Sequence, residues 1–84
     1  MKLEIYKNES VFDTGCIASE QETPKPAGYT LYAEFDGPGV ASAAQSLGLE
    51  LEKESPRYSA QTATAKIAFS LISSSSPFTM TFRG

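Results

Sequence analysis

The chain has 84 residues, of which 40% are hydrophobic and 20% are charged, and its net charge is −3. This composition is typical of a soluble globular protein. The length predicts a single small domain over residues 1–84, with no room for separate catalytic and binding domains. The excess of acidic residues disfavours a nucleic acid or an anionic membrane as the partner, because both attract lysine and arginine.

The sequence is poor in the residues that most often carry catalysis. It contains no histidine, the usual general base near neutral pH and the commonest metal ligand. Its single cysteine, Cys16, allows neither an intrachain disulfide nor a cysteine-based zinc site. We therefore expect no enzyme activity, no catalytic residue, no metal and no cofactor. No apolar signal segment follows Met1-Lys2, and no apolar run approaches the roughly 20 residues of a membrane span, so we expect a cytoplasmic protein.

Apolar and polar residues alternate in the first half of the chain, which predicts strands. The first strand covers residues 1–6. A less regular second strand covers residues 10–19, where Gly15 indicates a bulge. The stretch 20–28 contains two prolines and predicts a loop, whereas residues 29–36 predict the clearest strand of the chain.

A short helix is predicted directly after residues 29–36. Pro38 suits a first helical turn, because its missing N–H would have no partner there, and Gly48 fits the C-terminal stop. Between them, apolar residues recur at the spacing of one helix face: Val40, Ala43, Ala44 and Leu47. The helix has about ten residues, so packing must stabilise it.

The second half of the chain predicts further strands. Residues 49–55 alternate and form the fourth strand. The segment 61–73 fits a helix with one set of residues, Ala60, Ala63, Ile67 and Leu71, and a strand with another, Ala63, Ala65, Ile67, Phe69 and Leu71. The strand pattern includes more of the large side chains, and the alternation continues at Phe78, Met80 and Phe82, so we predict a terminal hairpin. The predicted fold is α+β, a mainly antiparallel β-sheet of five to six strands with one short α-helix, in the order βββαβββ.

Two tyrosines occupy the polar phase of their predicted strands. Tyr6 lies two residues from Glu4, and Tyr32 lies two residues from Glu34. Exposed tyrosines on a sheet are common anchors of protein interfaces, because they offer a large contact area at low entropic cost. The alternative is that tyrosine is only a good strand former with its hydroxyl in water.

An acidic stripe, Glu50, Glu52 and Glu54, points to one side of the fourth predicted strand. Successive carboxylates there are about 6.6–7 Å apart, of the order of the phosphate spacing in nucleic acids. Such a row would imitate a nucleic acid to a nuclease or another DNA-binding protein. It would equally serve as a solvated face that keeps a strand edge from pairing, and the mild net charge favours this second interpretation.

These observations favour a non-enzymatic protein-binding module. Small size, acidity and few catalytic groups make the chain similar in style to phage- or plasmid-borne inhibitors and to immunity proteins, although no motif is shared. We therefore expect a small acidic inhibitor or adaptor of bacterial or phage origin that covers a surface of a larger protein. The predicted partner-binding residues are Tyr6, Tyr32, Glu34, Glu50, Glu52 and Glu54.

The predicted sheet also suggests self-association. A helix of ten residues is too short to cover a sheet about 25 Å wide. The apolar face left over, which includes Leu51, Phe69, Met80 and Phe82, would exceed what a monomer normally exposes unless the loop 20–28 covers it. We therefore expect a homodimer. A structural subunit of a virion or other homo-oligomeric assembly is an alternative to the inhibitor.

Overall fold

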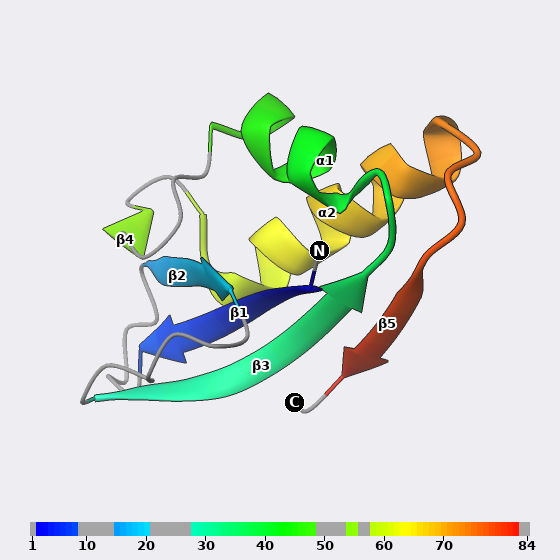
Figure 1. The fold of residues 1–84 in the computed structure, drawn as a ribbon. Coiled ribbons are helices and arrows are strands. Elements are labelled where there is room, and N and C mark those ends of the chain that lie inside the picture. The colour runs from blue at the N-terminus through cyan, green and yellow to red at the C-terminus, as the bar shows by residue number, and fades with distance from the viewer. Residues whose placement is uncertain (1, 9–14, 21–27, 49–53, 56–57, 83–84) are drawn as a thin grey trace.

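The protein is described by a computed structural model, which places residues 2–8, 15–20, 28–48, 54–55 and 58–82. It is an α+β structure with an antiparallel sheet and two helices (Figure 1). The elements are β1 (Lys2–Asn8), β2 (Cys16–Glu20), β3 (Tyr29–Asp36), α1 (Val40–Ser46), β4 (Glu54–Ser55), α2 (Ala60–Ser73) and β5 (Thr79–Phe82). Within these residues, four strands form the sheet and the two-residue β4 extends one edge, in the order β4-β2-β1-β3-β5.

The α+β class and the antiparallel sheet are confirmed, whereas the predicted order βββαβββ is not. The strand at residues 29–36 and the helix that follows it are present, and Gly48 adopts a positive φ of 73° just after α1. Of the fourth predicted strand only Glu54–Ser55 is described, as β4. Of the second predicted strand, the part from Cys16 onward is described as β2, with Gly15 directly before it, and residues 10–14 lie outside the described residues.

The prediction of a strand over residues 61–73 is wrong, because this segment is helix α2. The hydroxyl oxygen of Ser59 accepts a hydrogen bond from the backbone N–H of Thr62 at 3.2 Å and so caps the first turn. The helix buries the stripe of the helical alternative, with Thr64 beside it: Ala60, Ala63, Thr64, Ile67 and Leu71. Phe69 does not belong to this stripe and is 72% exposed.

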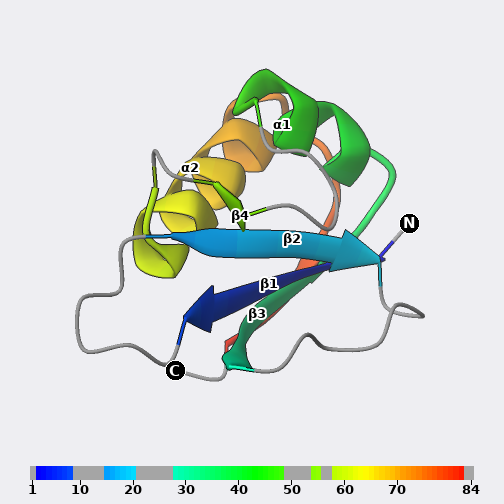
Figure 2. The same cartoon turned by 90° about the vertical axis from the view of Figure 1, so that its left-hand side faces the viewer.

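Both helices lie on one face of the sheet (Figure 2). Helix α2 packs over β1, β2 and β3, and α1 packs against α2 and β1. The core between the layers is built around fully buried Leu3, Ile5, Phe35 and Ile67. The helix layer therefore covers the middle of the sheet, and all four residues of the edge strand β5 are exposed.

A bulge in β3 changes which side chains face the helices. Ile5 pairs with Ala33, but the next residue, Tyr6, pairs with Leu31, so Tyr32 has no partner directly opposite on β1. Paired residues share a face of the sheet. Leu31 therefore lies on the face away from the helices, with Tyr6, and Tyr32 joins the core on the helix side.

Candidate interaction surfaces

The two tyrosines that the sequence presented as exposed anchors are both buried. Tyr32 is 9% exposed, because the bulge turns it toward the helix side. Its ring packs edge-on against Phe82 with 4.8 Å between centroids, and the Lys7 ammonium lies 5.8 Å from its centroid. Tyr6 is 6% exposed on the opposite face. The expectation of two exposed tyrosines on one sheet surface is therefore wrong, and no pair of anchors is formed by them.

Tyr6 instead belongs to a polar cluster with Glu4 and Glu34 on the sheet face away from the helices. Glu4 and Glu34 pair directly across β1 and β3, and Glu4 is buried whereas Glu34 is half-buried. Burial raises the pKa of Tyr6 above 10.0, and the negative charge of Glu4, the hydrogen bond between the Tyr6 hydroxyl and Glu4, and the charge of Glu34 raise it further. The tyrosine therefore keeps its proton to higher pH than a tyrosine in water.

The acidic stripe stays a prediction. Glu50 and Glu52 lie outside the described residues. The backbone of Glu54 is placed in β4, opposite Ile17 of β2 at the edge of the sheet. This position fits the interpretation that the stripe follows a strand edge.

Four large apolar side chains are exposed within the described residues. Phe69 is 72% exposed and Ile72 66%, both on α2, while Phe82 is 57% and Met80 45% exposed on β5. The sequence pattern assigned Phe69, Met80 and Phe82 to the apolar face of the sheet. Phe69 is outside because its segment is a helix, and the two β5 residues are outside because the helix layer ends before β5.

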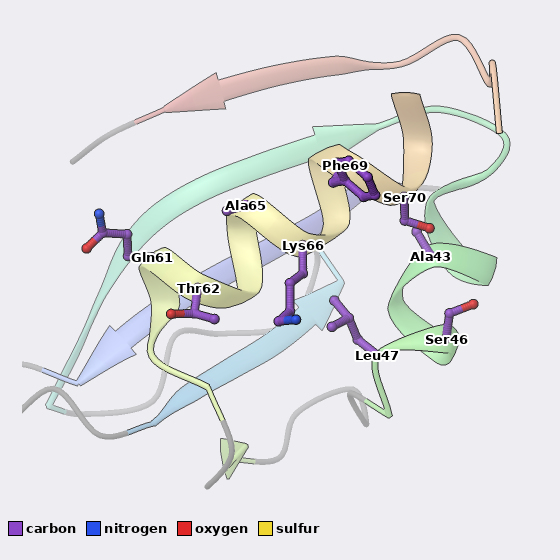
Figure 3. Close-up of a pocket in the computed structure, with 9 residues that line it drawn as sticks. All are labelled: Ala43, Ser46, Leu47, Gln61, Thr62, Ala65, Lys66, Phe69 and Ser70. Atoms are coloured by element: carbon purple, nitrogen blue, oxygen red, sulfur yellow. The ribbon is translucent and has the colours of Figure 1, made fainter. Parts of the chain in front are cut away.

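A groove of about 760 Å³ runs between α1 and α2 (Figure 3). Leu47 extends from the end of α1 toward α2, Ala43 and Ala65 add apolar surface, and Phe69 lies at the upper end of the groove in this view. Lys66 is the charged residue among the described residues of the lining, and its ammonium lies 5.5 Å from the centroid of the Tyr58 ring. The groove thus combines apolar walls with one positive charge. Sequence reasoning missed it because it depends on how two helices pack.

No group of three or more acidic or cysteine side chains lies close enough within the described residues to hold a metal ion. Cys16 is fully buried in the core, where a thiol behaves as a small apolar side chain.

Comparison with known proteins found no match: no family model, no curated protein and no solved structure corresponds to this chain. No helix in the described part of the chain is long and apolar enough to cross a membrane. Two apolar surfaces lie exposed on the described residues: the groove between α1 and α2, and the edge at β5.

Proposed function

We propose that the protein is a non-enzymatic protein-binding module, a small acidic inhibitor or adaptor that covers a surface of a larger protein. The observation that carries the proposal is Phe69, a phenylalanine that is 72% exposed at the rim of an apolar groove. Monomeric proteins rarely leave large apolar side chains in water beside a concave apolar surface unless a partner covers them. Aromatic side chains are also enriched at the centre of protein interfaces.

The groove between α1 and α2 also defines the chemistry of the partner. Its apolar walls, with Leu47 and Ala65, suit inserted apolar side chains. Lys66 adds a positive charge, and the described lining contains no acidic residue to neutralise it. The partner segment is therefore apolar with a carboxylate beside it, and this carboxylate would pair with Lys66 at the border of the contact.

The groove replaces the tyrosine surface in this proposal. Tyr6 and Tyr32 are buried, so binding through them would require the protein to rearrange, whereas Phe69 is already exposed. Contacts that need no rearrangement are the common case in protein complexes.

The experiment is affinity capture from the native host with immobilised protein and two variants. Phe69→Ser removes the rim of the groove, and Ile72→Ser is the matched control, since it removes an equally exposed apolar side chain of α2 that does not line the groove. Both residues are mostly exposed, so both variants should fold normally. We expect the unmodified protein and the Ile72→Ser variant to retain one partner in stoichiometric amount. The Phe69→Ser variant should retain about tenfold less of this partner, because it lacks one aromatic anchor. Retention of no stoichiometric partner, or equal retention by all three proteins, would contradict the proposal.

A further inference from the structure

The edge strand β5 is short, with four residues, but it carries no charge, proline or bulge that would prevent strands from pairing between molecules. It pairs with β3 on one side and lies at the end of the sheet order. Its sequence is Thr79-Met80-Thr81-Phe82, with no charge and no proline, and all four residues are exposed. Natural edge strands are normally short, charged, bulged or interrupted by proline. At the opposite edge, the described part of β4 is Glu54–Ser55.

Beside this edge, apolar side chains lie uncovered on the helix side of the sheet. Met80 pairs with Phe35 and Phe82 pairs with Ala33, so both side chains share the face on which the core is built. They remain about half exposed because the helices pack over β1, β2 and β3. Helix α2 lies between α1 and β5 (Figures 1 and 3), and Ile72 of α2 is 66% exposed and does not line the groove.

We propose that the free edge of β5 pairs antiparallel with β5 of a second copy, so that two chains form a homodimer with one continuous sheet. This contact does not use the groove between α1 and α2, so it stands independently of the proposed function. A twofold axis perpendicular to the sheet relates the copies and keeps the helices of both on the same face. Paired residues share a face, so a residue that faces the helices must pair with one that also does so.

The chemistry selects the register with Thr81 on the twofold axis. Thr81 then pairs with Thr81 of the second copy, and each Met80 pairs with Phe82 of the other copy. A threonine pair and two contacts between a thioether and an aromatic ring are both favourable cross-strand combinations. The alternative with Met80 on the axis also forms threonine pairs, between Thr79 and Thr81 of the two copies, but it lacks the Met80–Phe82 contacts. These contacts therefore select the register with Thr81 on the axis.

The area of this contact is that of a weak dimer. A full aromatic side chain offers about 150–250 Å², so the exposed parts of Met80 and Phe82 amount to about 200 Å² in each copy. With the strand backbone and the threonines, the total for both copies stays below about 1,200 Å², the range of weak and transient interfaces. We therefore expect the dimer to dissociate in the micromolar range.

The first test is the mass in solution by sedimentation equilibrium at about 50 μM, well above the micromolar dissociation expected of a small interface. The unmodified chain should have twice its 9.0 kDa mass. Phe82→Asp should sediment as a folded monomer, because a charge is placed in the contact at a residue that is 57% exposed. Phe69→Ser changes the groove and not β5, so this variant should remain a dimer. It therefore distinguishes dimerisation from binding of a partner at the groove. An unmodified chain of 9.0 kDa, or a Phe82→Asp variant that is still dimeric, would overturn the proposal.

The second test is disulfide cross-linking, which holds even if Phe82→Asp fails to fold. In the proposed register the Cα atoms of Thr81 in the two copies are about 4.5–5.5 Å apart, within the range of a disulfide. Thr81→Cys should therefore form a covalent dimer under mild oxidation. The Cα atoms of Thr79 in the two copies would be about 13 Å apart, so Thr79→Cys should stay monomeric on a non-reducing gel. Cys16 is fully buried and does not compete. Equal cross-linking of both variants, or of neither, would refute this pairing.

Discussion

Ser75 follows Ser74, the C-cap of helix α2, and adopts the left-handed conformation, with φ of 58°. The backbone N–H of Ser76 donates to the carbonyl oxygen of Leu71 at 3.2 Å, and the N–H of Ser75 donates to that of Ile72 at 3.1 Å. These two bonds form the Schellman motif, in which glycine is the preferred residue at the left-handed position. A residue with a side chain pays roughly 1–2 kcal/mol for this conformation, because its Cβ crowds the following carbonyl oxygen.

Ser75→Gly should therefore stabilise the protein. It recovers the roughly 1–2 kcal/mol of the left-handed conformation and loses about 0.5–1 kcal/mol, because glycine makes the unfolded chain more flexible. Ser75 is exposed, so no apolar contact is sacrificed. At the centre of these ranges the net gain is about 0.75 kcal/mol, which corresponds to a rise of about 3–6 °C in the melting temperature of a chain of this size. Thermal unfolding followed by circular dichroism measures it.

Ser74→Gly is the matched control one residue earlier. Ser74 is in the right-handed conformation, with φ of −85°, and its hydroxyl donates to the carbonyl oxygen of Leu71 at 3.0 Å. Glycine there gains nothing and removes this hydrogen bond, so the melting temperature should fall. The reasoning is refuted if Ser75→Gly melts at or below the temperature of the unmodified protein, or if the two variants shift in the same direction.

Three further changes test other parts of the fold. Gly37→Ala should lower the free energy of unfolding in urea by about 1–3 kcal/mol, because the added Cβ would lie 2.5 Å from the carbonyl oxygen of Pro77. An unchanged midpoint of urea unfolding would show that this contact relaxes freely. Ser59→Ala should cost about 1 kcal/mol by removing the cap on the N–H of Thr62, whereas Ser59→Asp should restore it. The raised pKa of Tyr6 means that the unfolded chain loses this proton first, so the free energy of unfolding should fall as pH rises above 10.0. Tyr6→Phe should show a shallower fall between about pH 9 and about pH 11, and equal slopes would exclude this cause.

The sequence alone predicted secondary structure correctly where the pattern lies within a single strand or helix. The strand Tyr29–Asp36 follows from alternation, and helix α1 follows from four apolar residues at helical spacing before Gly48. These patterns depend on backbone geometry within one element, so no other part of the chain is needed to recognise them. The antiparallel α+β class follows from the same local patterns, since most predicted strands are separated by short connections.

The candidate site was less predictable, because exposure depends on what packs over each residue. The sequence presented Tyr6 and Tyr32 as exposed, and both are buried, while it placed Phe69 and Phe82 on an inner face and both are mostly exposed. The groove between α1 and α2 left no signal in either helix by itself. The groove forms only when the two helices pack together, whereas a residue pattern describes one helix at a time.

Tertiary structure decided two questions that the sequence left open. Both the helical and the strand pattern of residues 60–73 include Ala63, Ile67 and Leu71, so the pattern could not choose between them. In the folded protein the helical stripe packs over β1, β2 and β3, and Phe69 stays outside. The bulge at Tyr32 has no local marker either, because it arises from the pairing of β3 with β1. The residue pairing across two strands determines which face a side chain takes, and that pairing is formed only when segments distant in the sequence meet.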